Sequence, residues 1–317
     1  MFNRFITKPE DLVTTHEQTR AGFLSIALEK NMIGDPYVKN ALAFKAMVAG
    51  TTGPDDFLTI PRIRPFMLTA AGLSDKSMNY LTEQDQTDAI KELIEKFLKP
   101  AGDSYVDEAM FRYLLIKGDA VGGTMRNRIG ALGQEKLVRS ILSCMNVQGI
   151  DYSWLPNDNG IFVWKRKSEN DAGIEKNIKA LHWKKGTSNR TLIFNATVPT
   201  VRKNVDICLF QGGPQDYDRG RIVRMTNSAI MLGELKGGID PAGADEHWKT
   251  ANTALNRIRT SFKAAGHEVM TSFVGAAIAN AMAVEIFDQL QAGTITNAAN
   301  LTDTNQLTEY CTWLIGI

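Results

Sequence analysis

Three charged residues stand in or beside apolar segments in the second half of the chain, and their types and spacing suit metal-assisted hydrolysis. Asp206 interrupts an apolar run over residues 205–210, and Glu234 and Lys236 end a second run over residues 230–236. Side chains two positions apart on a strand point to the same face. We therefore expect Glu234 and Lys236 to project together beside Asp206.

Two carboxylates that converge from neighbouring strands repel each other, and a divalent cation relieves that repulsion. Oxygen ligands of this kind suit Mg²⁺, which keeps several waters and binds phosphate oxygens. A lysine beside them offsets negative charge on an attacked phosphate. The pattern predicts a Mg²⁺-dependent nuclease core, with two alternatives: a plain Asp206–Lys236 ion pair, or residues solvated at a strand end.

A histidine follows this core at the start of a helix expected over about residues 245–264. Asp245 is a common residue type for the N-cap position, and His247 then falls in the first turn, facing back toward Glu234. A histidine there suits a general base near neutral pH, the alternative being a capping or surface histidine. The helix also carries a basic face that either contacts phosphates or is solvated: Lys249, Arg257, Arg259 and Lys263.

The elements that must position these residues change in character near residue 150. Before it the apolar spacing predicts helices, over 10–31, 87–98, 103–117 and 131–147. Between the last two, the glycines of residues 117–127 predict either a turn or a close approach of the backbone to a phosphate. After it short apolar runs predict strands at 161–164, 191–198, 205–210, 230–235 and 270–275, and a further helix at 278–291. We expect an α/β fold, with a mainly helical domain over 1–118 and a catalytic domain over 119–317.

Bulk composition narrows the class of protein. The 317 residues carry a net charge of +1 and contain only three scattered cysteines, so neither a uniformly basic protein nor a disulfide framework is indicated. No signal peptide and no run near the ~18 apolar residues of a membrane span is evident. We expect a cytoplasmic protein without membrane contact.

Longer stretches around the charged residues resemble the AvaI/BsoBI family of type II restriction endonucleases. The matching stretches are residues 202–210 and 232–255, with support from 20–23, 111–115 and 122–127. The resemblance implies a PD-(D/E)xK nuclease-like mixed sheet flanked by helices, joined to the helical domain. It also implies a homodimer that surrounds duplex DNA and cuts the palindrome CYCGRG after its first cytosine.

The resemblance also assigns roles to individual residues. Asp206, Glu234 and Lys236 would be the metal and phosphate residues. We further expect the Leu235 carbonyl to join Asp206 and Glu234 in holding Mg²⁺. His247 resembles the family's general base, although the sequence leaves open whether Lys236 or His247 accepts the proton. The DNA-binding positions carried over are Lys203, Asp240 and Lys76, and Arg126 is a further expected DNA-binding residue. Val205 stands where the generic motif has proline.

Other functions remain open beside this one. A non-catalytic, sequence-specific DNA-binding protein and a less specific repair nuclease would both fit the same fold. A metabolic α/β enzyme is disfavoured, because no phosphate-binding loop or dinucleotide fingerprint is present. A restriction enzyme also implies a cognate DNA methyltransferase in the host, without direct contact between the two proteins.

Overall fold

The computed structural model describes residues 2–158, 163–217 and 220–317, apart from the side chain of Arg126. The chain divides into two compact units. The first, which we call the sheet unit, comprises the chain up to Phe23 and the segment from Ile129 to Ile317. The second, the helical unit, comprises residues 24–128. The boundary expected at 118/119 lies inside one long helix.

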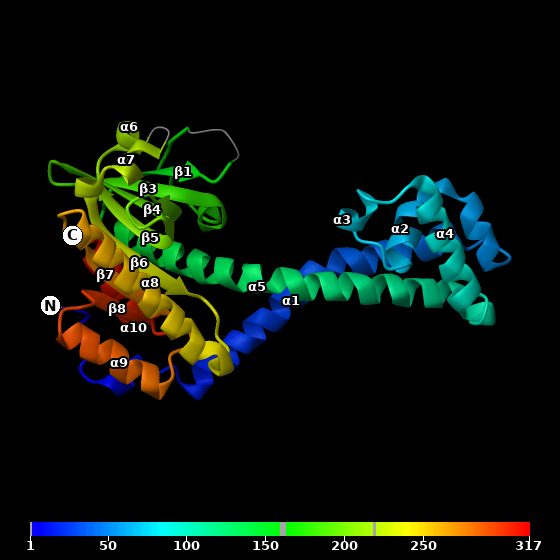
Figure 1. Cartoon of the computed structure of the whole chain (residues 1–317), viewed down its shortest axis with the longest axis horizontal. Helices are drawn as coiled ribbons and strands as arrows, with labels where there is room; N and C mark the ends of the chain where they lie inside the picture. Colours follow the sequence, from blue (N-terminus) through cyan, green and yellow to red (C-terminus); the bar gives the residue numbers. More distant parts are fainter. Residues whose placement is uncertain (1, 159–162, 218–219) are drawn as a thin grey trace. The chain divides into compact units, whose positions relative to one another are not determined.

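The sheet unit is built on a mixed sheet of eight strands among the described residues, in the order β2-β1-β3-β4-β5-β6-β7-β8 (Figure 1). Pairing is antiparallel from β2 to β6 and parallel from β6 to β8. The strands are β1 Tyr152–Pro156, β2 Lys165–Arg166, β3 Ile178–Lys185, β4 Ser188–Val198, β5 Lys203–Gln211, β6 Ala229–Lys236, β7 Met270–Gly275 and β8 Asn297–Asn300.

Helices pack on this sheet through apolar stripes. Along α8 (Ala244–Ala264) buried side chains recur every three or four residues, from Trp248 through Leu255 to Phe262, and α8 packs on β6 and β7. The helix α10 (Thr304–Gly316) contacts β8, and Asp303 caps it by accepting a hydrogen bond from the Gln306 N–H at 2.9 Å. The remaining helices of this part are α6 Pro214–Tyr217, α7 Arg221–Arg224 and α9 Asn280–Gln291.

The helical unit forms around the antiparallel parts of α1 (His16–Met47) and α5 (Tyr105–Val147), which both continue into the sheet unit. Lys45 pairs with Asp107 at 2.7 Å, and the Asn40 amide donates to the Tyr113 hydroxyl at 3.2 Å. The shorter helices are α2 Arg64–Ala70, α3 Asp75–Met78 and α4 Glu83–Leu93, extended by a π turn over Ile94–Leu98. Short 3₁₀ turns elsewhere span Pro9–Leu12, Pro54–Thr59, Pro61–Ile63, Gly102–Ser104, Ile174–Asn177, Thr226–Ser228 and Pro241–Gly243.

The prediction of a turn over residues 117–127 was wrong, because α5 runs unbroken through this segment. Each glycine in a helix interior costs about 1 kcal/mol relative to alanine, which is why the sequence indicated a break. Tertiary contacts outweigh that cost: Met125 is 2% exposed, and Arg128 pairs with Glu29 of α1. The strand expected at 161–164 falls partly on residues outside the described part of the chain.

Within the described residues, no helix is both long enough and apolar enough to span a membrane.

Candidate active site

The three charged residues singled out by their spacing come together at one edge of the β5–β6 pair. The pairing of these antiparallel strands begins at Ile207 and Gly233, so Asp206 and Glu234 occupy the next opposed positions. At this end of the pair, the Leu235 N–H donates to Asp206 Oδ2 at 2.9 Å.

Lys236 bridges the two carboxylates. Its Nζ lies 2.7 Å from Glu234 Oε2 and 3.3 Å from Asp206 Oδ2. The Glu234 side chain is 7% exposed, whereas those of Asp206 and Lys236 are 24% and 22% exposed. The cluster therefore opens to solvent on the side of Asp206 and Lys236, with Glu234 at its base.

Burial and neighbouring charges both shift the pKa values of this cluster. Burial, followed by the negative charge of Asp206, raises the pKa of Glu234 to about 7, and Lys236 offsets only part of this. Burial lowers the pKa of Lys236, but the two carboxylates outweigh it and raise that pKa overall. One lysine thus faces two carboxylates, leaving an excess negative charge that a cation would neutralise.

The donor set suits a hard cation that keeps part of its water shell. The described residues contain no cluster of three or more His, Cys, Asp or Glu side chains able to hold a metal. Mg²⁺ needs no such cluster, because it usually binds one or two carboxylates together with waters and substrate phosphate. The N–H and C=O of one residue in a strand point to the same edge, so the Leu235 carbonyl lies on the Asp206 side as well. The residues present fit Mg²⁺.

His247 lies in the first turn of α8, as expected, and is exposed. Its ring rests against the loop that follows β6: a Cβ added to Gly243 would lie 3.3 Å from Nε2, and one on Gly238 would lie 3.6 Å from it. None of the hydrogen bonds or ion pairs found within the described residues joins His247 to Glu234. Asp240 is exposed in the same loop, where its Oδ1 accepts a hydrogen bond from the Ala242 N–H at 2.9 Å.

The other predicted DNA-binding residues are dispersed. Lys203 is exposed at the first position of β5, three residues before Asp206. Lys76 is exposed on α3, which belongs to the helical unit. Arg126 lies on α5, and its side chain is outside the described part of the structure.

One neighbour of the site was missed by the sequence analysis. Asn195 occupies the β4 position opposite Asp206, between the pairs Phe194–Ile207 and Ala196–Val205. Its φ of 51° is left-handed, a conformation that asparagine tolerates better than most residues. Lys179 Nζ donates to the carbonyls of Phe194 and Asn195, both at 2.9 Å, and so supports this irregular point in β4. In the sequence, the only sign of this irregular point is an asparagine within an otherwise apolar strand.

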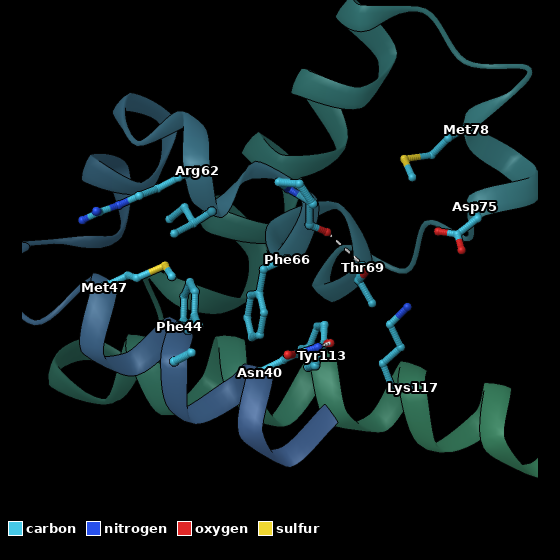
Figure 2. Close-up of a pocket in the computed structure, with 13 residues that line it drawn as sticks. Asn40, Phe44, Met47, Arg62, Phe66, Thr69, Asp75, Met78, Tyr113 and Lys117 are labelled. Atoms are coloured by element: carbon cyan, nitrogen blue, oxygen red, sulfur yellow. Dashed lines mark hydrogen bonds between the residues drawn. The ribbon is translucent and has the colours of Figure 1, made fainter. Parts of the chain in front are cut away.

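A separate hollow lies within the helical unit (Figure 2). Its volume is about 350 Å³, and its wall includes Phe44, Phe66 and Tyr113, whose rings stack at centroid distances of 4.0 Å. Phe44 and Tyr113 are buried in the core of this unit, and Phe66 is partly buried and packs against that core. The lining holds one carboxylate, Asp75, so it lacks the paired acids found beside Lys236.

Comparison with known proteins covers nearly the whole chain. The family model described as restriction endonuclease BsobI matches residues 2–317. The type II restriction enzyme BsoBI of Geobacillus stearothermophilus is 48% identical over 317 residues, which is all of this chain and 98% of the relative. The type II restriction enzymes AvaI of Nostoc sp. and of Anabaena variabilis are each 46% identical over 312 residues, covering 98% of both chains.

Proposed function

Because this chain belongs to the BsoBI family of restriction endonucleases and is a type II site-specific deoxyribonuclease, we propose that it hydrolyses duplex DNA at CYCGRG, after the first cytosine, with Mg²⁺ as cofactor. The observation that carries the chemistry is the contact of Lys236 with Asp206 and Glu234 at 3.3 and 2.7 Å. An Asp on one strand and a Glu-x-Lys triplet ending the next is the arrangement of a PD-(D/E)xK core, here with Val205 before the Asp.

Each residue has a distinct role in this proposal. Asp206 and Glu234 hold Mg²⁺ together with the Leu235 carbonyl. When bound, the ion stabilises negative charge on the scissile phosphate and makes water a better nucleophile. Lys236 brings a second positive charge to the phosphate, since two carboxylates keep it protonated.

The same raised pKa makes Lys236 a poor proton acceptor in the metal-free arrangement. We assign the proton-accepting role to His247, whose ring lies at the loop that follows Lys236. DNA-contacting roles are proposed for Lys203, Asp240, Lys76 and Arg126. Exposure of Lys203 on the same strand as Asp206 supports the first of these.

A homodimer is part of the proposal, because a palindrome presents two equal half-sites to two equal subunits. The helical unit leaves an apolar surface that a second copy would cover. Val38 and Leu42 of α1 are 48% and 58% exposed, and Phe111 and Leu115 of α5 are 64% and 71% exposed. The contacts of Lys45 with Asp107 and of Asn40 with Tyr113 set the register that places these four residues on adjoining turns.

The dimer is tested by Leu115→Glu, which puts a charge on this surface while leaving the sheet unit unchanged. We expect the variant to elute as a monomer and to lose cleavage. Lys96→Glu, at an exposed ion pair elsewhere in the helical unit, is the matched control. An unchanged dimer for Leu115→Glu would remove this surface from the interface.

The chemistry is tested with Lys236→Met on a short duplex that carries one CYCGRG site. Cleavage should be lost while binding of the duplex is retained, because the lysine acts on the phosphate during reaction. Lys96→Met serves as the control, and a duplex with one base pair changed tests the sequence. Cutting by Lys236→Met at the wild-type rate would contradict the catalytic assignment.

A further inference from the structure

The backbone immediately after Lys236 touches the backbone of α5. A Cβ built on Gly133 would stand 2.5 Å from the Cα of Gly237. One built on Gly237 would stand 3.0 Å from the Cα of Gly133 and 3.0 Å from the Ile129 carbonyl oxygen. Side-chain carbons essentially never approach backbone that closely, so alanine at Gly133 would displace either the loop or the helix.

A second helix meets the same loop two residues further on. A Cβ built on Gly22 of α1 would stand 2.4 Å from Cγ1 of Ile239 and 3.0 Å from its Cβ. The Ile239 side chain is 5% exposed and therefore has little room to give way. On the strand side, the Lys236 carbonyl accepts a hydrogen bond from the Ala276 N–H at 2.8 Å. Residues 236–239 are thus held from three directions.

Glycine is a poor residue for a helix interior, since it favours the unfolded chain. Other helical glycines of the same two helices face open space: nothing lies within 4 Å of a Cβ built on Gly34 or Gly130. At Gly22 and Gly133, by contrast, the missing side chain is what permits the contact. These two positions therefore have a packing requirement that their neighbours lack.

We propose that Gly22 and Gly133 are positioning residues, through which α1 and α5 clamp the loop over residues 237–239. The clamp fixes Lys236, which precedes that loop, and Asp240, which follows it. This inference rests on the proposed role of Lys236 in DNA cleavage. Because the clamp acts on the geometry of the reacting groups, it governs the rate of cleavage at saturating DNA.

The test compares Gly133→Ala with Gly130→Ala, the same change one turn earlier in α5. The readouts are the single-turnover cleavage rate at saturating DNA and Mg²⁺, the DNA Kd without metal, and the thermal unfolding midpoint. We expect Gly133→Ala to cleave on the order of 100-fold more slowly, as for a displacement of about 1 Å. Its Kd should weaken far less than its cleavage rate, and its unfolding midpoint should fall below that of Gly130→Ala, because the new Cβ displaces packed backbone. Equal cleavage rates at a temperature where both variants are folded, or a slower rate matched by an equal fold-loss of DNA affinity, would overturn the proposal.

A second variant pair keeps the test decisive if Gly133→Ala does not fold. Gly22→Ala alone should slow cleavage, and adding Ile239→Ala should restore much of the rate, because it removes the atom that the new Cβ meets at 2.4 Å. Gly34→Ala is the control in α1. Absence of any rescue in the double variant, with the single variants slowed additively, would overturn the clamp.

Failure of the clamp is distinguishable from failure of the proposed function. If wild type and Gly130→Ala cut DNA and Lys236→Met does not, the proposed chemistry stands whatever Gly133→Ala does. If Lys236→Met cuts as wild type does, the chemistry assigned to Lys236 fails, and the clamp fails with it.

Discussion

Glu234→Gln should stabilise the metal-free protein at alkaline pH while abolishing cleavage. The pKa of Glu234 is about 7 in the folded protein, against 4.5 in its ordinary state, chiefly because the side chain is buried and then because Asp206 is near. A raised carboxyl pKa means that the folded state binds the proton more tightly. The stability of the wild type therefore falls as pH rises from about 4.5 to about 7, then stays level.

The size of the effect follows from the same two pKa values. Ionisation of Glu234 lowers the free energy of unfolding by less than about 1 kcal/mol at pH 5 and by about 3 kcal/mol at pH 8. Glutamine has nearly the same shape and does not titrate, so the variant avoids this cost. At pH 8 the unfolding midpoint should rise by roughly 5–10 °C.

The assay is unfolding in EDTA followed by tryptophan fluorescence at pH 5 and pH 8. All five tryptophans (Trp154, Trp164, Trp183, Trp248 and Trp313) lie in the sheet unit, so the signal reports the unit that holds Glu234. The wild type and the variant should differ little at pH 5 and clearly at pH 8. A difference that is the same at both pH values would contradict a raised pKa of Glu234, as would a variant less stable than the wild type at pH 8.

Three further results are expected. The apparent affinity for Mg²⁺ should decrease as pH falls below about 7, because protons then compete for Glu234; calorimetric titration with Mg²⁺ at pH 6 and pH 8 checks this. His247→Ala should lower the single-turnover rate by roughly 10²–10⁴-fold with DNA binding retained, and a near-wild-type rate would return the proton-accepting role to Lys236. Arg139→Ala should destabilise the sheet unit by about 1–3 kcal/mol in the fluorescence assay, because Arg139 pairs with Asp171 at 2.8 Å and also with Glu175. An unchanged stability would mean that these half-buried ion pairs contribute nothing to the free energy of unfolding.

The candidate site was predictable because its signals are local. Alternation along a strand places Glu234 and Lys236 on one face, and an acid inside an apolar run singles out Asp206. The structure confirms that these side chains meet. The pairing of β5 with β6, which decides how closely they meet, is a long-range property that neither run contains.

Other elements depend on contacts distant in sequence. The strand β8 has the sequence Asn-Ala-Ala-Asn, residue types that are depleted in strands. Its asparagines are held by the N-terminal segment: Asn297 Oδ1 accepts from the Asn3 N–H at 3.2 Å, and Asn300 Nδ2 donates to the Leu12 carbonyl at 3.0 Å. Similarly, the close approach of Gly133 to Gly237 joins segments about a hundred residues apart, and nothing in either segment alone reveals it.

We propose that Asp206, Glu234 and Lys236 form the centre of a Mg²⁺-dependent, site-specific nuclease. Its most direct test is a digest of a sequenced plasmid by the purified wild type and by Glu234→Gln, each with Mg²⁺ and with EDTA. We expect discrete fragments that map to CYCGRG, from the wild type with Mg²⁺ only. Fragments in EDTA or from the variant would contradict it. A smear would indicate a less specific nuclease, and tight binding without cutting would leave a DNA-binding protein with no catalytic role for this cluster.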